Sequence, residues 1–414
     1  MRLLIISNMD HYLRDGRVVG AWDAAVREID ALSELFDEVR HLAVLRSGIV
    51  PKQARSYESS RVRLVPMPPS GGPRLRDKLE VAARLPAAAW RIRRELASAD
   101  AVHVRTPASI AYAALPLMAL TRRAPRRWIK YAGDWRPRGR DPISFRLQRF
   151  LLRRFSPEAR VSVNGYWQNA ASHVVSFPNP SFSITEAREA AARTAFKQLT
   201  TPVRLLFVGR LHAAKGAARA IDIVAGLREQ GIEARLDIAG DGPERERLEV
   251  QARQDGLSGQ VRIHGWLGRT SLNDLYRGAH FVTLPSSGAE GWPKALSEGM
   301  AYRAVPLAGA VGGVASVLRR KRAGLALPSE DVRAWVGAIA NIVRSPERWI
   351  ELADGAQTAA ADFTYEVYLE RVREILDLRR RPAATEHQPD VPHEGNVLSR
   401  IRRWKGETLM EACS

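Results

Sequence analysis

Two glutamates in the segment AEGWPKALSEGM have types and a spacing that suit chemistry on a phosphorylated substrate. Glu290 and Glu298 are separated by seven residues, and Pro293 lies between them. Because proline is favoured at the first position of a helix, we expect a helix to begin there, with free N–H groups that bind a diphosphate. Glu298 would then lie ~7 Å along that helix, so the two carboxylates could reach hydroxyl groups on both sides of the phosphates, as in a nucleotide sugar. The alternative is a surface helix with two ordinary glutamates, one of them paired with Lys294.

A second segment, FVGRLHAAKG, places an arginine and a lysine just after a predicted strand. Gly209, Arg210, Lys215 and Gly216 would lie at the carboxyl end of this strand, where open α/β sheets bind ligands. The forked guanidinium and the ammonium could together hold a leaving diphosphate without a metal ion. No Asp-x-Asp pair suited to a metal-bound diphosphate occurs in the sequence. The alternative is that both cations are solvated loop charges in an arginine-rich protein.

Short apolar runs alternate with helical-period sequence along the chain, which is typical of βαβ units in a doubly wound sheet. In the first half the runs are residues 2–7, 38–45, 62–67, 99–105 and 127–133. A second series begins with RLLFVGR and continues with EARLDIAG, QVRIHG and HFVTLP. We therefore predict an α/β protein with two Rossmann-like, doubly wound domains facing across a cleft, residues 1–180 and 203–360, joined by a proline-punctuated linker at 181–202.

Length, cysteine content and charge limit the class further. A chain of 414 residues is long for a single core, and one cysteine, Cys413, permits no intrachain disulfide, which fits a reducing cytosol. The N-terminus has the pattern of a buried strand rather than a signal peptide, and the apolar run at 108–120 is shorter than the ~20 residues that a membrane span needs. We expect a cytoplasmic protein, with attachment to the inner face of the membrane left open. The net charge of +19 favours polyanionic partners, lipids or phosphorylated substrates.

The chain resembles the group 1 (family 4) glycosyltransferases of GT-B fold. The resemblance rests on the two segments above and on AGDGPERERLE, VRIHGWL, SLNDLYRGAHFVTLPS, PLAGAVGG and FTYEVYLERVREIL. It covers residues 204–378 well and is weaker over 1–180. It implies that 203–360 binds a nucleotide sugar, that 1–180 binds the acceptor, and that 361–380 form a helix crossing back to the first domain. The polar, proline-rich residues 381–414 are expected to form a disordered tail.

By this resemblance, the donor is a nucleotide sugar, UDP- or GDP-linked, and no further cofactor or metal is implied. Arg210 and Lys215 would bind the diphosphate, Glu298 the ribose and Glu290 the transferred sugar. The other donor-side candidates are Gly209, Gly265, Trp266, Leu267, Gly291, Trp292, Pro293 and Lys294. The family's usual retention of anomeric configuration implies a front-face reaction in which the departing phosphate oxygen takes the acceptor proton. Catalysis would then rest on positioning and on stabilisation of the leaving diphosphate.

The acceptor side departs from the family pattern, because SNMDHYLRDGRVVGAW stands in place of a Gly-rich loop. Asp10, His11 and Arg14 are the acceptor candidates in this segment; the alternative is an ordinary polar loop. The segment KYAGDW offers Asp134 as a catalytic candidate where the family often has a histidine. His103 and Arg105, which we place at the carboxyl end of a strand, are expected to line the cleft, His103 as a catalytic or acceptor-binding group.

Two arginine-rich segments, residues 84–96 and 144–155, could form helices that lie on an anionic membrane carrying a lipid-linked acceptor. The alternative is that their apolar faces pack on the first sheet while their arginines face water. The expected setting is bacterial surface polysaccharide or glycoconjugate synthesis, with a glycan, lipid-linked or small-molecule acceptor. Competing interpretations are a basic nucleic-acid- or membrane-binding protein on a non-catalytic scaffold, a sugar phosphorylase and an epimerase. Because no zinc spacing or helix-turn-helix pattern occurs, no nucleic-acid partner is expected.

Overall fold

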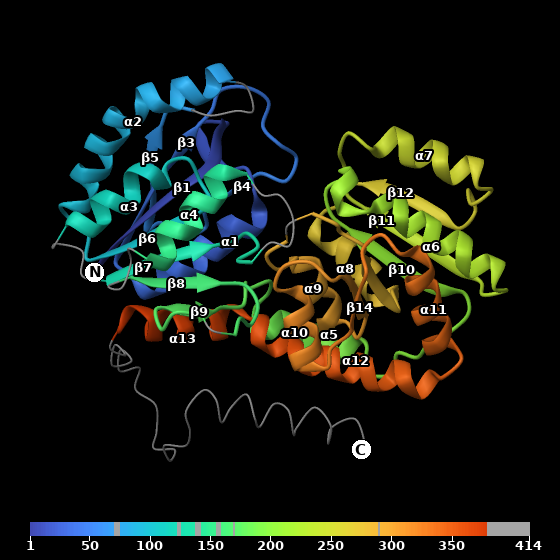
Figure 1. Ribbon diagram of the computed structural model, residues 1–414. Helices are drawn as coiled ribbons and strands as arrows, with labels where there is room; N and C mark the ends of the chain where they lie inside the picture. The colour runs from blue at the N-terminus through green and yellow to red at the C-terminus, as the bar shows by residue number, and fades with distance from the viewer. Residues whose placement is uncertain are drawn as a thin grey trace, which may run out of the picture.

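The computed structural model describes residues 1–69, 75–121, 126–136, 142–154, 159–168, 170–288 and 290–378. These residues form two α/β domains that lie side by side, the first in blue to green and the second in yellow-green to orange (Figure 1). The predicted fold class is therefore confirmed. The predicted tail, residues 381–414, lies outside the described residues.

The first domain is built on a mostly parallel sheet in which β5, β3, β1, β6, β7, β8 and β9 follow one another. Residues 3–6 of the central strand β1 are apolar and fully buried, because both faces of the sheet are covered. The strands are β1 (Arg2–Arg14), β2 (Arg17–Gly20), β3 (Glu38–Leu45), β4 (Arg55–Ser56), β5 (Val62–Met67), β6 (Ala101–Thr106), β7 (Arg126–Tyr131), β8 (Arg160–Val163) and β9 (Val174–Ser176). The helices are α1 (Asp23–Leu32), α2 (Leu75–Leu96), α3 (Ala111–Leu120) and α4 (Ile143–Arg154).

The segment after the first predicted strand is not a loop. β1 continues to Arg14 and turns into β2, which pairs antiparallel with residues 11–14 of β1 and with β4. Asp15 and Gly16 form the turn with positive φ angles of 52° and 74°. Residues 11–14 have no regular alternation of apolar and polar side chains, and it is their main-chain pairing with β2 that makes them a strand.

The second domain has an entirely parallel sheet in the strand order β12-β11-β10-β13-β14-β15. This is the doubly wound order, and its direction reverses between β10 and β13, so that a crevice opens at the carboxyl ends of these two strands. The strands are β10 (Val203–Val208), β11 (Ala234–Ala239), β12 (Val261–Gly265), β13 (Phe281–Leu284), β14 (Val305–Gly309) and β15 (Leu325–Leu327). The helices are α6 (Ala217–Glu229), α7 (Arg245–Gln254), α8 (Arg269–Gly278), α9 (Lys294–Ala301), α10 (Val314–Lys321), α11 (Val332–Val343) and α12 (Pro346–Ala360).

Two helices connect the domains. The predicted linker contains α5 (Ile184–Arg193), which begins with a capping box formed by Ser183 and Glu186. α13 (Tyr365–Leu376) follows α12 and lies beneath the first domain, drawn in red in Figure 1. Its buried residues, among them Tyr368 and Val372, join one hydrophobic cluster with Leu3 and Ile5 of β1. The end of the chain therefore completes a core that its first strand begins.

Among the described residues, none of the helices combines the length and the apolar character that a membrane crossing requires.

Candidate functional site

The two sequence motifs meet at the crevice of the second domain. β10 and β13 are adjacent, so the loops that follow them lie side by side. Lys215 follows β10, and its Nζ donates a hydrogen bond to Oε1 of Glu290, which lies in the loop after β13. Gly216 ends the short 3₁₀ turn with φ 83°, and a Cβ there would lie 2.2 Å from the carbonyl oxygen of Pro285. Only glycine fits this close approach, which fixes Lys215 against the second loop.

Arg210 contacts the first domain directly. Its guanidinium carbon lies 4.7 Å from the ring centroid of Trp22, which precedes α1. A cation over an aromatic face is attracted to the ring, so Trp22 holds the Arg210 side chain at the border of the two domains. Trp22 is not among the residues predicted from the sequence. The sequence contains one indication of it, an aromatic residue directly before the helix that the structure shows as α1.

Glu298 lies inside α9 and is oriented by two donors. Nη1 of Arg269 donates to its Oε1 at 2.7 Å, and the hydroxyl of Tyr276 donates to its Oε2 at 2.8 Å. Burial disfavours the charge of Arg269, but Glu298 and Glu186 outweigh it and raise its pKa. Each carboxylate oxygen of Glu298 accepts one hydrogen bond in this arrangement. An ionised carboxylate can accept further hydrogen bonds through its remaining lone pairs. The carboxylate is thus held in place and still able to accept from further hydroxyl groups.

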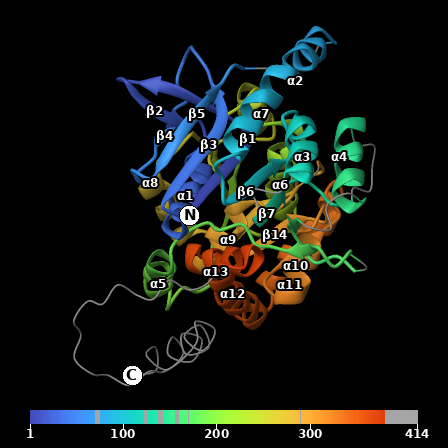
Figure 2. The same cartoon turned by 90° about the vertical axis from the view of Figure 1, so that its left-hand side faces the viewer.

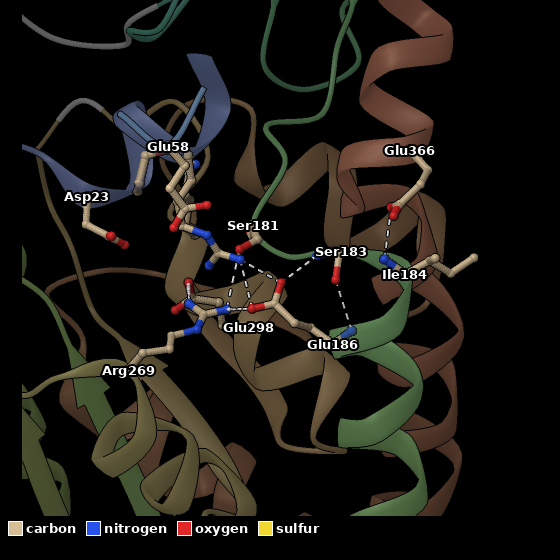
Figure 3. Close-up of polar contacts among 12 residues, drawn as sticks. Asp23, Glu58, Ser181, Ser183, Ile184, Glu186, Arg269, Glu298 and Glu366 are labelled. Carbon is tan, nitrogen blue, oxygen red and sulfur yellow. Dashed lines mark hydrogen bonds and ion pairs between the residues drawn. The ribbon is translucent and has the colours of Figure 1, made fainter. Parts of the chain in front are cut away.

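The same ion network reaches the first domain. Nη2 of Arg269 lies 3.7 Å from Oε1 of Glu186 on α5, and Glu186 accepts two hydrogen bonds from Arg27 of α1, at 2.6 and 2.8 Å. Figure 3 shows Arg269, Glu298 and Glu186 pointing toward one another, with Ser181 and Ser183 alongside. Four helices, α1, α5, α8 and α9, therefore converge on Glu298. Arg269 was not predicted from the sequence, although it lies two residues after the donor-side candidate Leu267.

The interpretation of α9 as an ordinary surface helix is wrong. Most of the helix is buried, including Leu296 and Met300, and Glu298 is paired with Arg269 rather than with Lys294. Lys294 instead donates to the carbonyl oxygen of Ala24 in the first domain at 3.1 Å. Burial lowers the pKa of the Lys294 ammonium. Lys294 therefore links the start of α9 to α1.

The domains touch closely around the Glu290 loop. A Cβ on Gly291 would lie 2.1 Å from the carbonyl oxygen of Ala132, just after β7, and one on Gly313 would lie 2.5 Å from that of Asn164. Nearby, the Tyr166 amide donates to Oγ of Ser316 at 2.9 Å. The glycines of the second domain thus permit backbone-to-backbone contact with the carboxyl edge of the first sheet. The two domains are therefore in direct contact at this edge.

Asp134 is the predicted first-domain residue that lies at this contact. It is buried and accepts a hydrogen bond from the Arg136 amide at 2.9 Å. A Cβ on Gly312 would lie 2.0 Å from the carbonyl oxygen of Glu290 and 3.6 Å from Cγ of Asp134. The structure therefore brings Asp134, Gly312 and the Glu290 loop together.

His103 does not line the cleft, contrary to our expectation. It lies in the middle of β6, is 0% exposed and stacks on Trp128 with 3.7 Å between ring centroids. Burial lowers its pKa well below the usual value. Three residues of β6 follow His103 before the strand ends at Thr106. Because alternate residues of a strand point to opposite faces, the His103 side chain lies on one face of the sheet, against Trp128, rather than at the carboxyl end of the strand. The structure therefore places His103 in the core of the first domain.

Arg105 lies in a buried ion cluster rather than in an open cleft. Oε1 of Glu28 accepts from Arg105 at 3.1 Å, from Nζ of Lys130 at 2.7 Å and from the hydroxyl of Tyr368 at 3.0 Å. Burial acts to raise the pKa of Glu28, but Arg105, Lys130 and Lys294 outweigh it and hold the pKa well below its usual value. The cluster joins α1, β6, β7 and α13, and Arg105 serves it structurally.

The three acceptor candidates of the first segment also have structural partners. His11 is buried, and its Nε2 is 2.8 Å from the hydroxyl of Tyr57. Asp10 pairs with Arg46 at 2.6 Å, and Arg14 donates to backbone carbonyl groups of the neighbouring loop. The prediction of an acceptor contact is wrong for the buried His11. Asp10 and Arg14 stabilise the hairpin and its surroundings.

The remaining donor-side candidates differ in their surroundings. Gly265 has φ 73° and approaches Arg245, Trp266 after it is exposed, and Leu267 is half-buried, so this segment borders solvent at the end of β12. Gly209 donates its N–H to the carbonyl of Ala239, and Pro293 caps α9. The Trp292 side chain, in contrast, is buried and stacks on Phe363 at 4.8 Å, so it belongs to the core. A donor contact of Trp292 stays a prediction.

No group of three or more histidine, cysteine, aspartate or glutamate side chains arranged to hold a metal ion occurs in the part of the chain that the structure describes.

The two facing Rossmann-like domains define the class as GT-B, and solved structures of that fold are similar over nearly their whole length. Sucrose-phosphate synthase from Thermosynechococcus elongatus matches with a TM-score of 0.66 and 18% identity, over 91% of this chain and 98% of that one. Anabaena HepE in complex with UDP and glucose matches with a TM-score of 0.59 and 16% identity, over 91% and 99%. At such identities the likeness establishes the fold.

The second domain matches a known family. Residues 191–359 match the family model described as Glycosyl transferases group 1. D-inositol 3-phosphate glycosyltransferase of Xylanimonas cellulosilytica is 31% identical over 216 residues, 49% of this chain and 50% of the relative. Alpha-D-kanosaminyltransferase of Streptomyces kanamyceticus is 30% identical over 172 residues, 42% of this chain and 44% of the relative. The chain spans about half the length of the curated relatives it matches.

Proposed function

We propose that the protein is a retaining, metal-independent glycosyltransferase that moves a sugar from a UDP- or GDP-linked donor to a glycan, lipid-linked or small-molecule acceptor. We place its work in bacterial surface polysaccharide or glycoconjugate synthesis on the cytoplasmic side of the membrane. The observation that carries the proposal is the contact between Lys215 and Glu290 at the switch point of the second sheet, with Glu298 on the helix that follows. Similar proteins that have been crystallised with UDP and with UDP-glucose support a nucleotide-sugar donor.

Each charged group has a separate task in this proposal. Lys215 and Arg210 bind the donor diphosphate and stabilise the charge that grows on it as the bond from the sugar carbon to phosphate oxygen breaks. Glu290 accepts hydrogen bonds from the transferred sugar. Glu298, held by Arg269 and Tyr276, accepts hydrogen bonds from the ribose hydroxyl groups.

The reaction needs no further base in this scheme. The acceptor hydroxyl forms the new bond to the sugar carbon on the face that the diphosphate leaves, and its proton passes to the departing phosphate oxygen. The direct contact of the two domains around Gly291 and Asp134 excludes water, which would otherwise compete as acceptor. Asp134, next to the Glu290 loop, is the first-domain carboxylate placed to orient the acceptor hydroxyl.

The test is calorimetric binding of UDP, GDP and ADP without divalent metal, followed by turnover with the sugar nucleotides of the base that binds. We expect one base to bind, Glu298→Ala to weaken that binding, and Lys215→Ala to reduce kcat about a hundredfold or more. Arg277→Ala on α8 is the matched control, because Arg277 pairs only with the exposed Asp274 one turn away. A folded protein that binds no nucleotide would refute the donor site. Binding without turnover on any acceptor would instead support the non-catalytic scaffold.

A further inference from the structure

α4 buries its polar side and exposes apolar residues. Gln148 exchanges two hydrogen bonds with the backbone of Ala108, at 2.9 and 3.1 Å, and Arg149 donates to the hydroxyl of Tyr131 at 2.8 Å. On the opposite side Ile143 is 80% exposed and Leu147 46%. A surface helix ordinarily turns its apolar stripe to the core. Leu152 is buried and Phe145 and Leu151 are half-buried, whereas Ile143, Leu147 and Phe150 of α4 are exposed.

The exposed side of α4 forms one continuous face. Ile143, Arg146, Leu147, Phe150 and Arg154 recur at intervals of three and four residues, which places them on the same side of a helix. Phe150 is 52% exposed, and both arginines are exposed. We call these five residues the α4 face. It presents large apolar side chains and guanidinium groups together.

The charge of the α4 face indicates which kind of partner binds it. Residues 142–154 contain four arginines and no acidic residue. A face with one sign of charge is not self-complementary, which disfavours a second copy of the chain packed through the same surface. A polyanion such as nucleic acid would satisfy the arginines but not bury the apolar side chains. A bilayer with anionic headgroups can bind the arginines and also bury the apolar side chains.

A second helix on the same side of the domain has similar properties. On α2, Trp90 is 62% exposed and stacks with the Arg94 guanidinium at 5.5 Å, beside the exposed Arg93. Figure 2 shows α2, α3 and α4 together on the side of the first domain that faces the viewer. Tryptophan with basic neighbours is enriched where protein meets the headgroup layer. The two helices thus offer contacts of the same chemistry on one side of the molecule.

We propose that the α4 face binds an anionic lipid bilayer. Ile143, Leu147 and Phe150 enter the boundary between headgroups and acyl chains, while Arg146 and Arg154 contact the anionic headgroups. Binding holds the first domain against the bilayer that carries lipid-linked acceptors. The attachment itself does not depend on the proposed glycosyl transfer, because it is measured without substrate.

The experiment is flotation of the full-length protein with vesicles of phosphatidylcholine alone and of phosphatidylcholine mixed equally with phosphatidylglycerol. We expect binding to the anionic vesicles only, weakened by added salt. Arg146→Gln with Arg154→Gln should reduce the partition coefficient about thirtyfold, from the roughly fivefold effect of each arginine near an anionic surface. Ile143→Ser with Leu147→Ser, which leaves the charge unchanged, should reduce it by about tenfold or more.

The control variant removes two exposed arginines from the second domain, Arg235→Gln with Arg262→Gln, and should bind as the wild type does. Folding of every variant is checked by circular dichroism. Equal loss in the control and in the α4 arginine variant would overturn the proposal, because net charge alone would then explain binding. An undiminished partition of the serine variant would also overturn it. In that case competition by a single-stranded oligonucleotide would identify a polyanion site, and a change in sedimentation mass would identify a second copy.

Discussion

Replacing Glu28 by glutamine tests whether the buried ion cluster stabilises the first domain. The substitution keeps the size of the side chain and one acceptor oxygen, but it removes the charge shared by Arg105, Lys130 and Tyr368. Breaking a buried pair by removing one partner costs about 3–5 kcal/mol, because a charge is left without compensation. Since the amide oxygen still accepts a hydrogen bond, we expect a loss near the lower limit, about 3 kcal/mol.

The loss is read from thermal unfolding followed by circular dichroism. For a unit of the size of the first domain, about 3 kcal/mol corresponds to a decrease in Tm of roughly 6–12 °C. Tyr368→Phe, which removes one hydrogen bond from the same oxygen, should cost about 1 kcal/mol. The control is Glu58→Gln, whose carboxylate is 72% exposed and pairs with Arg55, and which should change stability by no more than about 0.5 kcal/mol.

The pH dependence gives a second measure of the same cluster. Burial lowers the pKa of Lys130 to about 7 in the wild type, and loss of Glu28 lowers it further. In the pH range between these two values the folded wild type carries a proton that the folded variant lacks. The stability difference between them therefore shrinks as the pH rises toward 7 and is constant above it. A Tm of Glu28→Gln equal to that of Glu58→Gln, with no pH dependence of the difference, would refute the assignment of Glu28 as the centre of a charged cluster.

Three further predictions concern the cleft and the second core. Gly291→Ala places a Cβ 2.1 Å from the carbonyl oxygen of Ala132, so the domains must separate, and kcat/KM should fall about a hundredfold with unchanged Tm; unchanged turnover would show that the closed arrangement is not the active one. Trp22→Ala removes the ring under Arg210 and should weaken nucleotide binding by about two- to fivefold in calorimetry, whereas equal affinity would show that the ring does not position the cation. Burial lowers the pKa of His280 to about 4, so its contribution to stability is complete above pH 6.5 and is lost as the pH falls toward 4, by up to about 1.4 kcal/mol per pH unit. Denaturant unfolding should show a flatter acid limb for His280→Gln, and parallel curves would contradict this.

The second domain was predictable from sequence because its signals are local. The strand RLLFVGR and the segment AEGWPKALSEGM each combine an element with the residues that follow it, and one rule about strand ends is enough to bring Lys215 near Glu290. The partners of these residues are not local. Arg269 and Glu186 reach Glu298 from α8 and α5, and no spacing in the sequence relates them.

The first domain was predicted less well for two physical reasons. Polar residues in a segment without regular periodicity were interpreted as a loop, whereas main-chain pairing with β2 makes residues 11–14 part of a strand and buries His11. Burial of charge was also unforeseen. Glu28 lies one helical turn before Leu32, on the core side of α1, and is stable there only because Arg105 and Lys130 arrive from other strands.

The position of α13 has a consequence for synthesis of the protein on the ribosome. Tyr368, Val372 and Leu376 share a cluster with Leu3 and Ile5, so this part of the first domain's core lacks a wall until nearly all of the chain has emerged. Residues 203–360, in contrast, form a contiguous unit whose strands and helices are available earlier than that wall. The domain that is translated first is usually also the first to reach its native packing. For the part of the first domain's core under α13, we expect the reverse order. A nascent chain stalled before residue 365 would expose the apolar surface under α13, although residues 203–360 of its second domain are already present.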